Sequence, residues 1–245
     1  LYACTEAFYR PGNMVLSVAG DVTLDQVVAA CRRAGLDAPP ARHTIEPALF
    51  APENDPPQKE LRFSMPVNKP CFAVGYREAP VPFGSARADM LGELLPELIC
   101  GGLTELYRKL YDEALVNPEF SGETVSVPGA CAVVFTGESE HPRVVADLLR
   151  AEIARLRRDG VDPELFTLVK NQMYGEMLAD VEGVEDAAEA MAAAFLHGYT
   201  LAEEVEALAA LTVSDANAAL QTMLQEDRAA YVEIEPQAAG EEELE

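Results

Sequence analysis

Prolines interrupt the chain between Leu36 and Lys59, and no helix or strand of ordinary length can run through that stretch. They stand at Pro39, Pro40, Pro47, Pro52, Pro56 and Pro57, with no sustained hydrophobic period between them. Proline fixes its own φ, removes a backbone donor and disfavours helix in the residue before it. The sequence therefore predicts an extended linker between two folded regions. The expected division is residues 1–38, a linker at 39–60, a second region at 61–235 and an acidic, disordered tail at 236–245.

The region before the linker has the pattern helix, strand, helix. Leu1–Arg10 is typical of the end of a helix, and Met14–Ala19 is an apolar run of strand length. Thr23 and Gln26 have the spacing of a capping box for a second helix, and Gly35 suits its carboxyl end. Because the first residue is leucine and no helix start precedes it, we expect the chain to be part of a longer protein.

The region after the linker mixes strand and helix patterns without regular alternation. Strands are predicted at Leu61–Met65, Cys71–Arg77, Phe120–Val127, Ala130–Thr136 and Tyr231–Ile234. Helices are predicted at Ser85–Cys100, with a kink or break near Pro96, and at Leu103–Leu115, Pro142–Arg158, Asp162–Val181, Val184–Leu196, Leu201–Leu211 and Asp215–Leu224. Strands grouped before and after packed helices favour an α+β fold, a two-layer sandwich of a mainly antiparallel sheet covered by helices.

The charge balance and the cysteines narrow the possible partners and setting. The 42 acidic and 18 basic side chains give a formal net charge of −24, which repels nucleic acid and anionic membrane surfaces. No apolar run approaches the roughly 18 residues that a membrane helix needs. The 5 cysteines are widely spaced, without a C-x-x-C pair. This pattern indicates reduced thiols rather than a disulfide framework, so we expect a cytoplasmic protein with neither nucleic acid nor membrane as partner.

No local catalytic motif is present. The histidines are His43, His141 and His197, and they lie too far apart in sequence for H-E-x-x-H or H-x-x-E-H to occur. The chain also lacks a G-x-S-x-G elbow and a glycine-rich phosphate loop. An acidic cluster at Glu182–Glu189 either binds a cation or, in the simpler interpretation, is a solvated helix face. We therefore assign no catalytic and no metal-binding residue to this chain.

Several segments match the pattern of one known family. Phe8–Leu16 (FYRPGNMVL), followed by Val18–Val22 (VAGDV), has the form of a segment that closes a first domain, and Gly101–Leu115 (GGLTELYRKLYDEAL) has the form of a glycine-led helix in a second domain. Asp162–Phe166 and Leu211–Asn217 fit the same pattern. In these segments the chain resembles the insulinase and mitochondrial processing peptidase (pitrilysin-type) family of zinc metallopeptidases, most of all its bacterial processing-protease branch.

The resemblance implies that this chain is the carboxy-terminal, non-catalytic part of such a peptidase. Residues 1–38 would complete the preceding, catalytic-type domain, and residues 61–235 would form a second, inactive domain. The family holds its zinc ion in the first domain, so the resemblance implies no metal or cofactor here. Many members use an arginine and a tyrosine of the second domain to hold the substrate backbone. Near those positions this chain has Tyr111 and Asn117, which are candidate substrate-binding residues or, alternatively, a half-buried helix tyrosine and a turn asparagine.

The implied function is the substrate-enclosing half of a zinc-dependent metalloendopeptidase that acts on unfolded peptides, with cleavage only by the full-length protein. The expected partners are the missing amino-terminal catalytic domain and peptide substrates. An alternative is a non-catalytic scaffold or partner subunit of a heteromeric peptidase-like complex, in which a homologous subunit is a further partner. A third is an unrelated acidic α+β binding domain.

Overall fold

The computed structural model describes residues 1–36, 58–127 and 129–237, so the predicted linker and tail lie largely outside the described residues. Its helices are α1 (Tyr2–Phe8), α2 (Leu24–Arg33), α3 (Ala86–Cys100), α4 (Glu105–Asp112), α5 (Pro142–Asp159), α6 (Pro163–Ala179), α7 (Val184–His197), α8 (Leu201–Ala210) and α9 (Val213–Thr222). Its strands are β1 (Glu60–Met65), β2 (Cys71–Glu78), β3 (Ser121–Val127), β4 (Ala130–Glu138) and β5 (Ala229–Pro236). Within this part of the chain, no helix is both long and apolar enough to cross a membrane.

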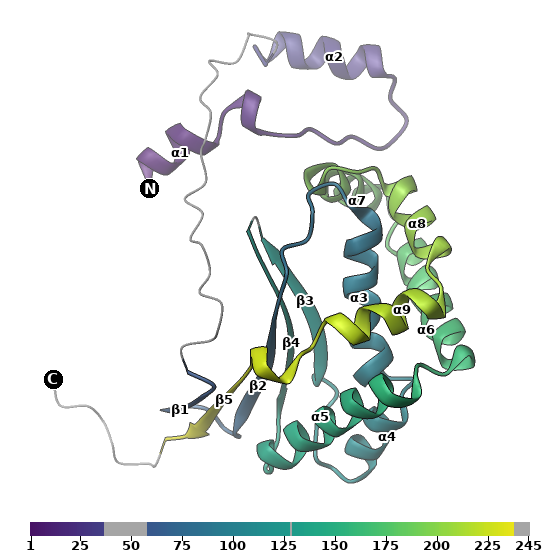
Figure 1. Ribbon diagram of the computed structural model, residues 1–245. Helices are drawn as coiled ribbons and strands as arrows, with labels where there is room; N and C mark the ends of the chain where they lie inside the picture. The colour runs from purple at the N-terminus through teal and green to yellow at the C-terminus, as the bar shows by residue number, and fades with distance from the viewer. Residues whose placement is uncertain (37–57, 128, 238–245) are drawn as a thin grey trace, which may run out of the picture.

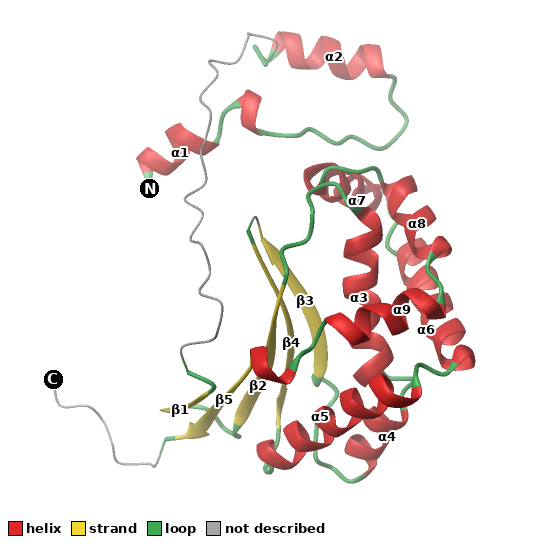
Figure 2. Ribbon diagram, viewed as in Figure 1, coloured by secondary structure: helices red, strands yellow, loops and turns green. Residues whose placement is uncertain are grey.

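The α+β class predicted from the sequence is confirmed, because the strands form one layer and the helices after the linker form another (Figure 2). The strands make one sheet in the order β1-β5-β2-β4-β3. β1 and β5 are parallel and the other neighbours are antiparallel. The predicted hairpin is confirmed as the β3–β4 pair, with Val127 opposite Ala130. The last strand of the chain, β5, thus lies between the first two.

Strands β2 and β4 show how the sequence directs one face of the sheet to the core. In β2, Phe72, Val74 and Tyr76 are almost completely buried, whereas the residues between them are only partly buried. β4 alternates in the same way, with Val133 and Phe135 buried. The register pairs Val74 with Phe135 and Tyr76 with Val133, so the buried side chains share one face. This period of two is typical of an antiparallel sheet with one packed face.

Helix α3 lies against the covered face of the sheet and carries the centre of the core (Figure 1). Leu94 and Ile99 have no exposed surface, and α5, α6, α8 and α9 pack around the helix. The helix continues through Pro96, which is buried. Gly92 permits a close approach to β3, because Thr124 Oγ1 donates a hydrogen bond to the Gly92 carbonyl at 2.6 Å. The sheet and the helical layer are therefore tightly joined.

Helix boundaries follow local capping chemistry. The capping box predicted for α2 is confirmed, and α8 begins with an equivalent box formed by Thr200 and Glu203. Helix α9 begins earlier than the predicted Asp215, because Thr212 caps it and Asp215 takes the reciprocal position. Helix α4 ends at Asp112, before the predicted end, and Ala114 just beyond it adopts a left-handed backbone with φ of 53°. The sequence therefore located the helices better than their ends.

The strand predicted at Met14–Ala19 is wrong, because the segment belongs to no sheet. Its backbone is extended at Met14, with φ of −127° and ψ of 151°. The side chains of Met14, Leu16 and Val18 are largely exposed. A strand is defined by hydrogen bonds to a neighbouring strand, and no strand among the described residues pairs with this segment. The apolar pattern therefore identified an extended segment without a partner.

Candidate functional site on the open face of the sheet

The face of the sheet that the helices leave uncovered carries apolar side chains on every strand, although β3 also presents Ser121 and Glu123 there. Leu61, Val232 and Ala73 are paired across β1, β5 and β2 and form one row on this face. Phe63 on β1 is 49% exposed, and Val125 on β3 is 44% exposed. Thr124 bonds to α3, so its neighbour Val125 projects to the opposite, open side. A contiguous exposed apolar surface of this kind is typical of an interaction site.

A pocket of about 470 Å³ opens on this face of the sheet. Its apolar floor includes Ala73, Val232 and Ile234 from β2 and β5. Glu138 of β4 and Glu119 of the loop between α4 and β3 also line it and bring two carboxylates. The pocket can therefore hold an apolar side chain and pair a cationic group with a carboxylate at its border.

Asn117 lies beside this pocket, in the loop between α4 and β3. Its Nδ2 donates a hydrogen bond to Glu138 Oε2 at 3.2 Å, and its Oδ1 accepts one from the backbone N–H of Glu119 at 3.2 Å. The second bond, two residues along the chain, is typical of an asparagine turn. Asn117 thus holds the Glu138 carboxylate and the backbone at Glu119, and its predicted contact with a peptide stays a prediction.

Tyr111 lies on the exposed side of α4 and is 50% exposed. Its ring stacks on that of Tyr107, with ring centroids 6.1 Å apart and planes 9° apart. Residues four apart on a helix face the same way, which explains the stacking. The described hydrogen bonds tie Asn117 to the pocket but do not connect Tyr111 to it. The substrate contact of Tyr111 also stays a prediction.

A metal site does not form among residues 1–36, 58–127 and 129–237, where no group of three His, Cys, Asp or Glu side chains is arranged to hold an ion. His141 precedes α5 and His197 ends α7, whereas His43 lies outside the described residues. Burial raises the pKa of the thiols of Cys100 and Cys131, which disfavours the nucleophilic thiolate. The described residues therefore offer neither a set of zinc ligands nor an activated thiolate.

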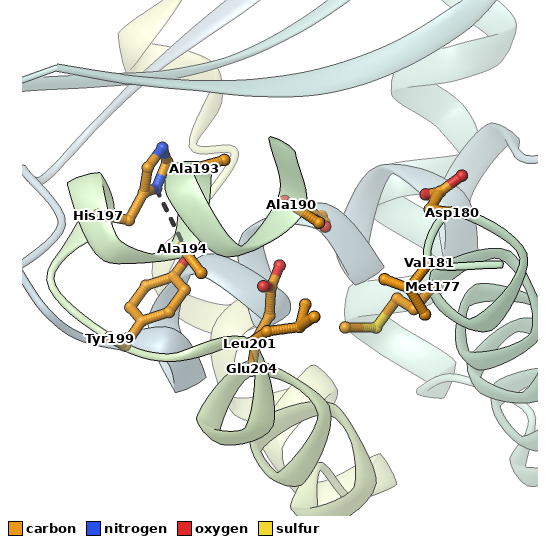
Figure 3. A pocket seen from close by; sticks show the side chains of 11 residues that line it. Met177, Asp180, Val181, Ala190, Ala193, Ala194, His197, Tyr199, Leu201 and Glu204 are labelled. Atoms are coloured by element: carbon orange, nitrogen blue, oxygen red, sulfur yellow. Dashed lines mark hydrogen bonds between the residues drawn. The ribbon is translucent and has the colours of Figure 1, made fainter. Parts of the chain in front are cut away.

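A second pocket, of about 270 Å³, lies between the helices (Figure 3). Glu93 of α3 and Glu204 of α8 line it, together with His197 and Tyr199. His197 Nδ1 lies 3.4 Å from Tyr199 Oη and 3.7 Å from Asp89 Oδ2. Three carboxylates and one imidazole therefore gather at the contact of α3, α7 and α8.

Two carboxylates of this second pocket, those of Glu93 and Glu204, bind protons more tightly than carboxylates in water do. Enclosure by protein raises the pKa of Glu93 to about 7, and the charges of Glu204 and Asp89 raise it further, whereas His197 lowers it. Burial also raises the pKa of Glu204. The Glu93 side chain still meets solvent, because the pocket is open. Glu93 therefore changes charge near neutral pH.

Sequence reasoning missed the acidic residues of both pockets. Glu93 and Glu204 stand inside helices, where glutamate is ordinary and carries no signal. For Glu119 and Glu138, the turn predicted at Asn117 indicates a loop near Glu119. Nothing in the sequence indicates that Glu119 and Glu138 lie close together. The acidic cluster at Glu182–Glu189 begins α7, where the helix dipole favours carboxylates, which fits a solvated helix face.

Comparison with known proteins identifies the family. The family model described as the peptidase M16 inactive domain matches residues 1–173. A protein of Bacillus subtilis (strain 168), described as the uncharacterized zinc protease YmfH, is 22% identical over 245 residues, which are 97% of this chain and 56% of that protein. This chain therefore spans about half the length of that relative.

Solved structures agree with this assignment. A protein from Alicyclobacillus acidocaldarius described as an M16-like peptidase matches with a TM-score of 0.80 and 25% identity, over 89% of this chain and 53% of that one. A peptidase M16 inactive domain from Pseudomonas fluorescens shares the fold, with a TM-score of 0.69 and 16% identity, over 90% of this chain and 52% of that one. The resemblance to the non-catalytic part of insulinase-type peptidases is thus confirmed. The chain belongs to the peptidase M16 family and contains its inactive domain.

Proposed function

We propose that this chain is the non-catalytic, substrate-enclosing carboxy-terminal half of a zinc-dependent metalloendopeptidase that acts on unfolded peptides. The observation that supports this proposal is the apolar open face of the sheet, with its acid-bordered pocket. Helices already cover the other face, so the open face needs a second surface to shield it from water. An extended peptide held between this face and a catalytic half would provide that cover, and a narrow space would exclude folded proteins.

In this proposal the chain positions the peptide and does no bond chemistry. Zinc held by the preceding half would activate the hydrolytic water. Holding an extended backbone in one register removes translational and rotational freedom before the reaction. The open face would therefore influence kcat/KM without contacting the scissile bond.

Asn117 and Tyr111 have different proposed roles in holding the peptide. Asn117 acts through Glu138, because its amide fixes that carboxylate at the pocket. Tyr111 offers the edge and face of an exposed, stacked ring to the peptide backbone. Replacing Asn117 with alanine should therefore raise KM for peptides with a basic residue more than for neutral peptides.

Cleavage of a pool of unstructured peptides tests the proposed function. The full-length protein is assayed beside this chain, with and without a metal chelator. The expected result is chelator-sensitive cleavage by the full-length protein and none by this chain alone. A full-length protein that contains no zinc and cleaves nothing would instead make the chain part of a scaffold or partner subunit.

A pair of valine substitutions in the full-length protein tests the open face itself. Val125 projects from this face, and Val144 is similarly exposed on α5, in the helical layer. Val125→Asp should lower kcat/KM about tenfold, because it places a charge where an apolar peptide wall is proposed. Val144→Asp should leave kcat/KM unchanged, with similar Tm for both variants. Equal activity of the two variants would contradict the proposed wall.

We further propose that the protein works in the cytoplasm, with its own catalytic half as partner. The free cysteines, at Cys4, Cys31, Cys71, Cys100 and Cys131, are consistent with a reducing compartment. Cell fractionation with an antibody to this chain checks the location. Recovery in a secreted fraction, with disulfides formed, would contradict it.

A further inference from the structure

Helices α7 and α8 form a hollow of about 660 Å³ on the helical side of the molecule. Met191 and Phe195 line it from α7, and Leu201, Ala202 and Val205 line it from α8. Residues three or four apart on a helix form a row, so each helix contributes one apolar row. The hollow is thus a groove between two helices, the geometry into which the ridge of a third helix packs.

The apolar side chains of this groove are unusually open to water. Phe195 is 64% exposed and Met191 is 40% exposed, and Leu196 beside them is 61% exposed. Aromatic and long apolar side chains gathered in one concave place are typical of a binding surface rather than of a solvated helix. The groove lies in the helical layer, so it is separate from the open face of the sheet.

The surroundings of the groove carry one sign of charge. No lysine or arginine occurs between Lys170 and Arg228. Glu185, Asp186 and Glu189 stand on α7, and Glu203, Glu204 and Glu206 stand on α8. Among the residues that the structure describes, none of these carboxylates forms an ion pair with a lysine or arginine. An apolar groove that Glu206 lines, on two helices that carry acidic side chains and no lysine or arginine, is complementary to a partner that is apolar on one side and cationic on the other.

We propose that the α7–α8 groove docks a basic amphipathic helix from a partner protein. The apolar residues of that helix, at positions i, i+3, i+4 and i+7, would contact Met191, Phe195 and Val205. Its lysines and arginines would lie beside Glu206 and within the negative field of the other acidic side chains of α7 and α8. A second copy of this chain is disfavoured, because it would bring a further charge of −24. An extended peptide is disfavoured, because the groove is made of helices and offers no free strand edge.

Binding of a synthetic peptide to the 245-residue chain tests the proposal. The probe is a fluorescent helix of leucine and lysine with the leucines on one face, and its control has the same composition in scrambled order. The amphipathic probe should bind at least about tenfold more tightly than the scrambled one, because only it presents an apolar stripe. Equal binding of the two peptides would show attraction by charge alone and would overturn the proposal.

Two substitutions of exposed residues locate the binding. Phe195→Ser should weaken binding of the amphipathic probe about tenfold or more, as expected for an aromatic anchor. Leu168→Ser on α6 is the matched control, because Leu168 is 50% exposed and does not line the groove. It should leave binding unchanged. Loss of binding in both variants, or in neither, would show that the probe does not bind specifically in the α7–α8 groove and would overturn the proposed site.

The charge of the border is tested by Glu206→Gln. This variant should bind the probe a few-fold more weakly and depend less on salt, because it removes the carboxylate that lines the groove. An unchanged affinity and salt dependence would overturn the role of the border. The probe should also bind the full-length protein with the same affinity. Loss of binding by the full-length protein would show that another part of the same protein fills the groove. That result would overturn the proposal of a partner protein's helix, while the proposed peptidase function would be unaffected.

Discussion

The described residues before position 37 and those after position 57 use the same local signals and reach different results. In the later part, core side chains such as Val74 and Leu95 have no exposed surface. In the earlier part, neither α1 nor α2 contains a buried residue, although α2 begins with a capping box equivalent to that of α8. Caps and apolar patterns are therefore sufficient to form a helix, but they do not provide a core.

The difference lies in the partners that each element finds. α3 is enclosed by the sheet and by α5, α6, α8 and α9, whereas the apolar run at Met14–Ala19 has no strand beside it. Short helices are marginal in water without tertiary packing. The exposed Leu16 and Leu24 thus mark surfaces that would be buried by a neighbour.

A matched pair of leucine substitutions gives the largest expected effect. Leu95→Ala should lower the free energy of unfolding by about 3 kcal/mol, because it leaves a cavity in a packed core. Leu16→Ala should change it by less than about 0.5 kcal/mol, because that side chain is 61% exposed. Urea unfolding of both variants measures the difference. Equal losses would mean that the first region is packed in solution.

Replacing either of two glycines with alanine adds one methyl group, but the two substitutions should change the stability of the protein in opposite directions. A Cβ at Gly122 would lie 2.6 Å from the ring of Phe135 and 2.9 Å from Pro96, so Gly122→Ala should destabilise the protein by about 2 kcal/mol. Gly175, in α6, has open space around it, and Gly175→Ala should stabilise by about 0.5–1 kcal/mol. Thermal unfolding checks both signs. A stable Gly122→Ala variant would show that the sheet and α3 are less tightly joined.

The two capping boxes offer a direct comparison of the regions. Thr200→Ala removes the cap of α8 and should lower the free energy of global unfolding by about 1 kcal/mol. Thr23→Ala removes the same contacts from α2 and should reduce its helicity without changing the global transition. Circular dichroism with denaturant, and hydrogen exchange resolved by peptide, distinguish the two outcomes. A shift of the global transition by Thr23→Ala would mean that α2 is part of the cooperative unit.

The smallest expected effect concerns Glu93 and pH. Its pKa is about 7 in the folded protein, above its value in the unfolded chain, so the folded state binds more protons between those two values. Stability should therefore fall as pH rises from about 4.5 to about 7. Solvent access limits the change to less than about 1 kcal/mol. Glu93→Gln should remove this part of the pH dependence, seen as the difference between the two unfolding profiles, and identical profiles would contradict the assignment.

Local chemistry explains which parts of the fold the sequence predicted. The strands β2 and β4 and the Thr23 capping box depend on neighbours in sequence, and these predictions are confirmed. The family resemblance also came from contiguous motifs. The strand at Met14–Ala19 failed because pairing depends on a distant partner.

The candidate site was less predictable than the fold, because it is assembled from residues that are distant in sequence. Glu93 and Glu204 meet only because α3 and α8 pack together. Asn117 was noted, but its partner Glu138 lies across the β3–β4 hairpin. No pattern in either segment specifies that contact.

The place of β5 between β1 and β2 has a consequence for synthesis on the ribosome. β1 pairs only with β5 among the described strands, so it has no partner until the last part of the chain is made. A nascent chain that ends before Ala229 would present the unpaired edges of β1 and β2, which are sites for wrong association. The sheet therefore cannot be completed until Ala229–Pro236 has left the ribosome, and the edges of β1 and β2 stay unpaired until then.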